Sequence, residues 1–248
     1  YLITEFVDGI DLQARVRRKG PLPVRAALAC ILQAARGLDY AHRQGVVHRD
    51  VKPANLLRDA RGVVKVLDMG LARLESPEPQ ARASGSELTK AGMVMGTAAY
   101  MAPEQARDPR RADARSDIYS LGCTLYFLVN GKPPFTGSTE IDLIFSHIDQ
   151  TIPPLTTSSG DLEVGLDGIF RRMVAKAASD RFATMAELVS ALEDLYVKVR
   201  GEPRASGRPR EVESTSGPAT VSPDDHTELA IVIDAAGPAA GPIPRSNR

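Results

Sequence analysis

The chain has 248 residues, carries a formal net charge of zero at pH 7, and is 43% hydrophobic. A chain of this length can form one domain with a tail or two small domains. The balanced charge argues against nucleic acid or an anionic membrane surface as the main partner, and no apolar run is long enough to span a bilayer.

The N-terminal run, residues 1–7, is apolar and rich in β-forming residues, which predicts a strand that Asp8 and Gly9 then end. Asp11 stands just before the next apolar position, a place typical of a helix N-cap. Because the first residue is Tyr1 rather than Met and falls within this strand, we expect the chain to be a fragment of a longer polypeptide.

A long helix is predicted to begin at Pro21 and Pro23, because proline suits the first turn of a helix. Its apolar positions recur at spacings of three and four residues and form one stripe. They are Val24, Leu28, Ile31, Ala35 and Leu38. Gly45 is placed to end the helix, which we interpret as part of the core with no chemical role.

Residues 48–55 read His-Arg-Asp-Val-Lys-Pro-Ala-Asn and place a carboxylate, an ammonium group and a carboxamide in one short loop. Pro53 lacks a backbone donor, so the segment cannot be the interior of a helix. Asp50, Lys52 and Asn55 suit a phosphate site, which needs a group for a nucleophile's proton, a cation for phosphate oxygens and an oxygen ligand for Mg²⁺. The alternative is a solvated polar loop without chemistry.

Residues 63–67 alternate like a strand and deliver Asp68 at their end. Residues 59–62 predict the turn of a small hairpin that contains this strand. The hairpin would fold Asp68 back toward Asn55, so that two oxygen ligands for one metal ion could meet.

The segment from Leu71 to Met101 is long, and Ser, Gly, Pro and charged residues gather between positions 75 and 90. A loop of this length within a compact domain is usually functional or disordered. Beyond it, residues 116–129 predict a helix that is apolar almost all round and therefore central. Further core helices are predicted over residues 166–176 and after a capping box that begins at Thr184.

From about Gly201 the sequence is rich in Pro and Gly, which predicts a disordered or linker tail over residues 201–248 behind a domain over residues 1–200. Cys30 and Cys123 lie far apart in apolar helical patterns, so we expect buried free thiols in a reducing compartment. No signal peptide is visible, and the expected location is cytoplasmic.

Three motifs in order, residues 48–55, Asp68-Met69-Gly70 and Ala102-Pro103-Glu104, resemble the catalytic half of a eukaryotic-like, bacterial-type Ser/Thr protein kinase. The resemblance runs from the first residue to about Val199. It implies a mainly α fold, namely the hinge and C-terminal lobe of a protein kinase with a small β-hairpin, and an N-terminal β lobe that is largely absent.

The resemblance implies transfer of the ATP γ-phosphate to Ser or Thr hydroxyls of protein substrates, with ATP and Mg²⁺ as cofactors. In this family Asp50 would orient the hydroxyl and accept its proton, and Lys52 would neutralise the γ-phosphate. Asn55 and Asp68 would ligate Mg²⁺. The implied contacts to the adenine and ribose of ATP involve Glu5, Val7, Asp11 and Leu57, with Thr4 as the gatekeeper. For Asp11 the helix N-cap remains the alternative.

The long segment resembles an activation loop, and Arg49 is the cation that in this family pairs with a phosphate on that loop. Thr89 is the first candidate for the phosphorylated residue, followed by Ser84 and Ser86, against the alternative that these hydroxyls are unmodified. Thr97 resembles the threonine that hydrogen-bonds the catalytic aspartate and lysine in Ser/Thr kinases. A second copy of the chain is an expected partner for autophosphorylation of the loop.

Two further roles implied by the resemblance are structural. Glu104 would form a buried ion pair with Arg181, and Asp117 would fix the backbone of the catalytic loop. Tyr119 and Phe182 replace a tryptophan and a proline that are common in the family.

The sequence contains no glycine-rich loop, small-lobe lysine or glutamate partner for that lysine, so we expect the chain alone to have little kinase activity. The chief alternative function is a pseudokinase or scaffold. A small-molecule phosphotransferase of related fold is a second alternative, although such enzymes typically lack Lys52 in this place and the Ala102-Pro103-Glu104 stretch.

Overall fold

The structure, a computed structural model, describes residues 7–68, 96–155 and 161–201, without the side chains of 161–164 and 199–201. All of these residues belong to one compact unit. The predictions for Thr4, Glu5, Ser84, Ser86 and Thr89, and almost all of the predicted tail, lie outside the described residues.

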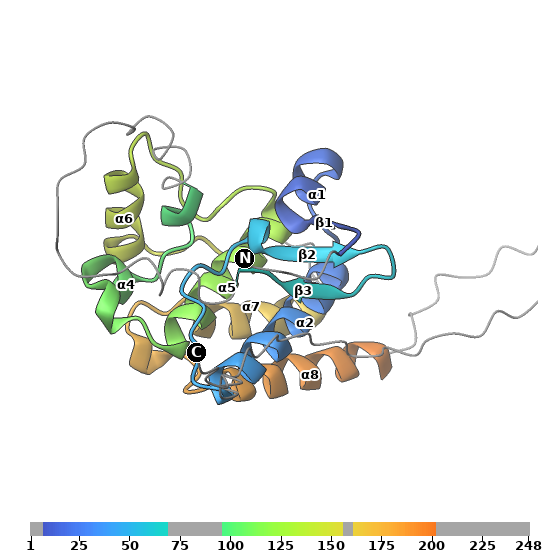
Figure 1. Cartoon of the computed structure of the whole chain (residues 1–248). Helices are drawn as coiled ribbons and strands as arrows, with labels where there is room; N and C mark the ends of the chain where they lie inside the picture. The colour runs from blue at the N-terminus through green and yellow to red at the C-terminus, as the bar shows by residue number, and fades with distance from the viewer. Residues whose placement is uncertain (1–6, 69–95, 156–160, 202–248) are drawn as a thin grey trace, which may run out of the picture. The chain divides into compact units, whose positions relative to one another are not determined.

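The described part is mainly helical, with one small sheet (Figure 1). The α-helices are α1 (Leu12–Lys19), α2 (Val24–Arg43), α4 (Pro103–Arg107), α5 (Ala114–Asn130), α6 (Glu140–Asp149), α7 (Asp161–Met173) and α8 (Met185–Gly201). The strands are β1 (Gly9–Asp11), β2 (Leu56–Asp59) and β3 (Val64–Val66). Short 3₁₀ turns are η1 (Pro53–Asn55), η3 (Pro109–Arg111) and η4 (Ala178–Asp180). This agrees with the predicted fold class.

The sheet confirms the predicted hairpin and adds a strand to it. Its order is β1-β2-β3 and both pairings are antiparallel, with Leu57 opposite Lys65 and Gly9 opposite Asp59. The predicted strand over residues 1–7 lies almost entirely outside the described residues; residues 7 and 8 belong to no strand, and Gly9 begins β1, a strand that was not predicted. A side chain at this position would bring a Cβ within 2.7 Å of the Arg58 carbonyl oxygen, so glycine permits the close pairing.

The core is built around α5, which is buried over most of its length, as its apolar sequence predicts. Helix α2 packs against α5 and α8, and Figure 1 shows α2 and α8 running side by side. Gly122 of α5 allows close contact with the end of α7, since a Cβ there would lie 2.6 Å from a methyl group of Val174. The buried helices thus form a rigid base beneath the hairpin and the loop of residues 48–55.

Local sequence signals explain most helix ends. Pro23 stands at the N-cap of α2, and Gly45 follows its end with a φ of 76°, as predicted. Helix α5 begins two residues earlier than predicted, because the Asp113 carboxylate accepts the backbone N–H of Arg115 and caps it. Over the described residues, no helix combines the length and hydropathy needed to cross a membrane.

Candidate active site

The loop of residues 48–55 is held by one buried carboxylate, as predicted for Asp117. Asp117 of α5 accepts the backbone N–H groups of His48 at 2.9 Å and Arg49 at 2.8 Å. Its Oδ2 also lies 2.7 Å from Nε2 of His42 near the end of α2. A fully buried carboxylate needs such partners, and here they tie the loop to the two central helices.

Arg49 takes an unusual backbone conformation within this loop, with a φ of 67°. Asp117 fixes its N–H, and the side-chain amide of Gln105 donates to its carbonyl at 2.7 Å. A non-glycine residue with positive φ persists only where the surroundings hold it, and such positions cluster at functional sites.

The next residues form the catalytic-loop cluster, which we define as Asp50, Lys52, Asn55 and Thr97. Lys52 Nζ donates to Asp50 Oδ2 at 2.7 Å and to Thr97 Oγ1 at 2.9 Å. Asn55 Nδ2 donates to the Asp50 carbonyl at 2.8 Å and to Asp50 Oδ2 at 3.1 Å. Lys52 and Asn55 therefore meet at one carboxylate oxygen of Asp50, and Thr97, from a distant segment, is joined to them through Lys52.

A divalent cation would find suitable donors beside this cluster. The Asn55 side chain uses its nitrogen for both of its hydrogen bonds to Asp50, so its amide oxygen is not engaged by them. Asp68 follows β3 with an exposed side chain, and the backbone N–H of its neighbour Leu67 donates to the Asn55 carbonyl at 2.9 Å. The hairpin thus brings Asp68 next to the Asn55 segment, and hard oxygen donors of this kind fit Mg²⁺.

Of the residues predicted to hold a nucleotide, the structure describes Val7, Asp11 and Leu57. Asp11 caps α1, since its Oδ1 accepts the backbone N–H of Ala14 at 2.7 Å, so the N-cap interpretation is confirmed. Asp11 also lines a pocket of about 290 Å³ together with Ala54 of the catalytic loop and α1 residues. Leu57 is half-buried in β2 directly opposite Asp11, and Val7 precedes β1.

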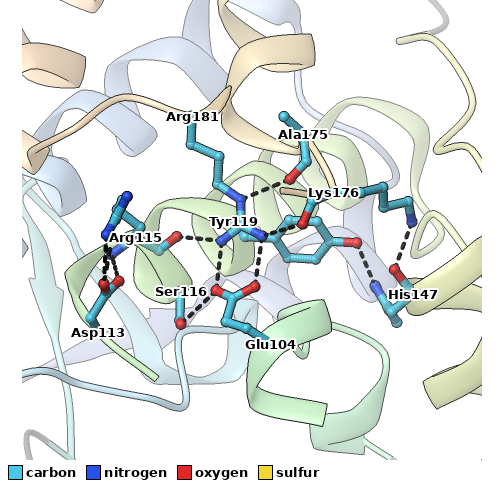
Figure 2. Close-up of polar contacts among 9 residues, drawn as sticks. All are labelled: Glu104, Asp113, Arg115, Ser116, Tyr119, His147, Ala175, Lys176 and Arg181. Atoms are coloured by element: carbon cyan, nitrogen blue, oxygen red, sulfur yellow. Dashed lines mark hydrogen bonds and ion pairs between the residues drawn. The ribbon is translucent and has the colours of Figure 1, made fainter. Parts of the chain in front are cut away.

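Below the loop lies the anchor cluster, which we define as Glu104, Ser116, Tyr119, His147, Lys176 and Arg181 (Figure 2). The predicted ion pair is present: the two guanidinium nitrogens of Arg181 donate to the two carboxylate oxygens of Glu104 at 2.7 and 2.8 Å. Ser116 adds a hydroxyl donor to Glu104 at 2.7 Å. Arg181 also reaches the carbonyls of Arg115, Ala175 and Lys176, so its fully buried side chain is well satisfied.

The charges in this cluster stabilise one another. Burial acts to raise the pKa of Glu104, but the hydrogen bonds and charge of Arg181 outweigh it and lower that pKa.

Burial raises the pKa of the Cys123 thiol to about 12, and both cysteines are free and buried as predicted. Neither thiol is therefore available for nucleophilic chemistry.

Three residues of the site were not predicted. His42 and Gln105 hold Asp117 and Arg49, and His147 hydrogen-bonds Tyr119. Each acts on a residue far away in the sequence, so no local spacing marks it. For His42 and His147 the only signal in the sequence is a histidine within a helix that carries apolar residues, and Gln105 has no such signal.

Comparison with known proteins matches this arrangement to a family. The family model of the protein kinase domain matches residues 1–192. The chain is 36% identical over 250 residues to the serine/threonine-protein kinase PknB of Mycobacterium tuberculosis H37Rv, an alignment that covers 100% of the chain and 36% of that protein. It is 40% identical over 189 residues to PknB of Mycobacterium leprae, which covers 76% of the chain and 29% of the relative.

A third relative is a probable serine/threonine-protein kinase PknB of Bifidobacterium longum, 37% identical over 187 residues, with 75% of the chain and 26% of the relative covered. The chain therefore spans about a third of the length of the curated relatives it matches. The order of motifs, the helical base and the family match agree, and the chain belongs to the protein kinase domain family.

Proposed function

We propose that the protein containing this chain is a Ser/Thr protein kinase, which transfers the γ-phosphoryl group of ATP to Ser or Thr hydroxyls of proteins. The observation that carries the proposal is the position of Lys52, whose ammonium group bridges Asp50 and Thr97. The names of the relatives, all serine/threonine-protein kinases, support the same reaction class.

The chemistry requires positioning and charge neutralisation more than covalent participation. Asp50 would accept the hydrogen bond of the acceptor hydroxyl and take its proton as phosphate transfer proceeds. The Lys52 ammonium group has three N–H donors, and its hydrogen bonds to Asp50 and Thr97 use two of them, so one donor would remain for phosphate oxygens. Both side chains are partly exposed, Asp50 at 32% and Lys52 at 20%, so reactants can reach them.

Asn55 and Asp68 would hold Mg²⁺, which when bound supplies charge neutralisation on the nucleotide phosphates. Asn55 is well suited because only its nitrogen is used by Asp50, so these hydrogen bonds leave its amide oxygen available as a ligand. Asp11, Val7 and Leu57 would border the nucleotide. At Asp11 only Oδ1 is used for the α1 cap, so Oδ2 remains for a ribose hydroxyl.

Regulation by a phosphorylated loop is supported by Arg49. Its Nε is buried and has no hydrogen-bond partner among the residues that the structure describes. A buried guanidinium N–H without a partner is costly, and an anion would satisfy it. We propose a phosphate on Thr89 as that anion, transferred by a second copy of the natural polypeptide.

The test uses the natural polypeptide that contains residues 1–248, with the chain alone in parallel. Transfer of radiolabelled phosphate from ATP to a Ser/Thr peptide library is measured for the wild type and for Asp50→Asn. We expect Asp50→Asn to lower the rate by about 10²- to 10⁴-fold, the usual contribution of a positioned acid or base. We also expect the chain alone to transfer phosphate much more slowly than the natural polypeptide.

The matched control is Asp149→Asn, the same chemical change at an exposed residue at the end of α6. It should leave the rate unchanged. Equal rates for Asp50→Asn and the wild type would overturn the proposed function, and a scaffold role would then be preferred.

A further inference from the structure

The imidazole of His147 is a buried titratable group that the proposed reaction does not use. His147 lies near the end of α6 with no exposed surface. Figure 2 shows its ring directed at Tyr119 of α5, whose hydroxyl lies 2.9 Å from His147 Nδ1. Phe135 packs edge-on against the imidazole with ring centroids 5.0 Å apart.

The ring of Tyr119 is also held by Arg181, another member of the anchor cluster. The guanidinium of Arg181 lies over the Tyr119 ring at 4.8 Å from its centroid, which is a favourable cation–π distance. Arg181 is in turn fixed by Glu104 at the start of α4. These contacts fix the Tyr119 ring, so the position of its hydroxyl beside His147 does not depend on the hydrogen bond to His147 alone.

The protonation state of His147 follows from its surroundings. Burial and the charge of Lys176 lower its pKa to about 4, while a backbone interaction with Ala99 offsets part of this shift. The imidazole is thus neutral at physiological pH, and the Tyr119 hydroxyl can donate to Nδ1. The remaining proton is then on Nε2, which makes no hydrogen bond of ordinary geometry to the described residues, so the interaction with the Ala99 backbone is a weak contact.

Helix α6 is also fixed at its C-terminal end. Lys176 Nζ donates to the carbonyl of His147 at 2.7 Å and lies 3.5 Å from that of Ser146. A cation at the last carbonyls of a helix interacts favourably with the helix dipole. Two independent contacts, one at a side chain and one at the backbone, therefore hold α6 at His147.

Residues 97–101 connect His147 with the catalytic-loop cluster. His147 interacts with the backbone of Ala99, which is buried, and Thr97 accepts a hydrogen bond from Lys52. After this segment the chain enters α4, which packs against α6. Because α6 packs on α4, and residues 97–101 lead into α4, we expect a shift of α6 to reach residues 97–101.

We propose that Tyr119 and His147 form a positioning pair that fixes residues 97–101 and thereby sets the affinity of the site for its protein acceptor. The proposal rests on the proposed kinase function and assigns the acceptor side of that site. Neither residue touches a reactant. Their hydrogen bond acts through the backbone of residues 97–101, so it affects binding of the acceptor more than the chemical step.

The first test is steady-state kinetics of the natural polypeptide with the variant Tyr119→Phe, which removes only the hydroxyl. We expect KM for a peptide acceptor to rise about five-fold, because one buried hydrogen bond is lost, while kcat and KM for ATP stay within about two-fold. The control is Thr124→Val, which removes another buried hydroxyl of α5, one that donates to the Ser120 carbonyl within the same helix. It should leave KM for the peptide unchanged.

His147 is tested by two substitutions. His147→Leu should raise KM for the peptide at least as much as Tyr119→Phe does. His147→Asn places a side-chain acceptor where Nδ1 stands, so it should recover part of the lost affinity. A rise in KM for the peptide that Thr124→Val reproduces, or an equal loss for Leu and Asn, would overturn the proposal.

The second test does not depend on activity and uses the chain of 248 residues. Hydrogen exchange of the amides in α6 and residues 97–101 should become about five-fold faster in Tyr119→Phe and remain unchanged in Thr124→Val. Uniform or absent acceleration would overturn the positioning role. If the wild type transfers no phosphate while exchange changes as expected, the proposed function fails and the structural coupling stands.

Discussion

Two ion pairs with the same distance but different burial distinguish the two polar regions of this molecule. Lys52–Asp50 in the catalytic-loop cluster and Arg181–Glu104 in the anchor cluster both have a nitrogen–oxygen distance of 2.7 Å. The first pair is 20% and 32% exposed, and the second is 0% and 18% exposed. The pair that we propose to meet reactants is accessible on both sides, whereas in the anchor pair the arginine is fully enclosed.

The two regions also differ in how their partners are supplied. Lys52 has two side-chain acceptors, so a reactant can replace one of them without unfolding the loop. Arg181 is bound by one carboxylate and three backbone carbonyls, none of which can leave without exposing a buried charge. Distance alone therefore does not identify a functional pair, and the following predictions separate the two kinds.

The largest effect is expected at Asp117, because this fully buried carboxylate holds the backbone of the loop of residues 48–55. Asp117→Ala would leave the buried backbone N–H of His48 and the partly buried backbone N–H of Arg49 without their acceptor. We expect the free energy of unfolding to fall by about 3–5 kcal/mol and phosphate transfer to be lost as well. Urea denaturation measures the first effect. The exposed Asp149→Ala serves as control and should change stability by less than about 0.5 kcal/mol.

Breaking the anchor pair should lower stability while the catalytic-loop cluster stays intact. Glu104→Gln keeps the shape of the side chain but removes the charge that compensates the buried Arg181. We expect a loss of about 3 kcal/mol in the free energy of unfolding. A comparable loss for Lys52→Met, at the partly exposed pair, would contradict the distinction between the two regions.

The anchor cluster should also respond to pH through His147. Its pKa of about 4 lies below the value of about 6.5 for an unfolded chain, so between these values only the unfolded chain binds the proton. Stability conferred by neutral His147 is therefore complete above about pH 6.5 and decreases as the pH falls toward 4.

At pH 5 this loss amounts to about 2 kcal/mol, since one pKa unit corresponds to about 1.36 kcal/mol. Urea denaturation at pH 7 and pH 5 measures it for the wild type and for His147→Asn. The variant cannot titrate, so its loss between the two values should be smaller by about 2 kcal/mol. Equal losses in both proteins would show that other groups cause the pH dependence.

The sequence predicts the catalytic-loop cluster because its members stand close together or belong to recognisable motifs. Asp50, Lys52 and Asn55 fall within the eight residues 48–55, and the hairpin that brings Asp68 back is marked by alternation and a turn. The central helix is predictable for a similar reason, since its apolar character is continuous. Such local patterns predict contacts between residues that are close in the sequence.

The supporting contacts could not be predicted because they join residues that only the fold brings together. Tyr119 and His147 are on different helices, and His42 meets Asp117 across the core. In the sequence Gly9 indicates only a break in a strand. The reason for a glycine at this position is the nearby Arg58 carbonyl, which belongs to the neighbouring strand and is not visible in the local sequence. Helix α6 was not predicted although Thr139 and Asp142 form a capping box, since Asp replaces the usual Glu or Gln there.

The smallest effect is expected at an exposed pair that shares the 2.7 Å distance, Arg36 of α2 with Glu193 of α8. Their side chains are 31% and 42% exposed, so water screens the attraction and ordering two long side chains offsets much of it. A double-mutant cycle of Arg36→Ala and Glu193→Ala should give a coupling energy of about 0.2–1 kcal/mol.

The same cycle with Glu104→Ala and Arg181→Ala should give a clearly larger coupling energy, because there both partners leave an enclosed site. Chemical denaturation in low and in high salt adds a second criterion. The coupling of the exposed pair should weaken with salt, whereas that of the anchor pair should persist, since ions screen buried charges much less. Equal coupling in both cycles would mean that burial does not separate the two kinds of pair.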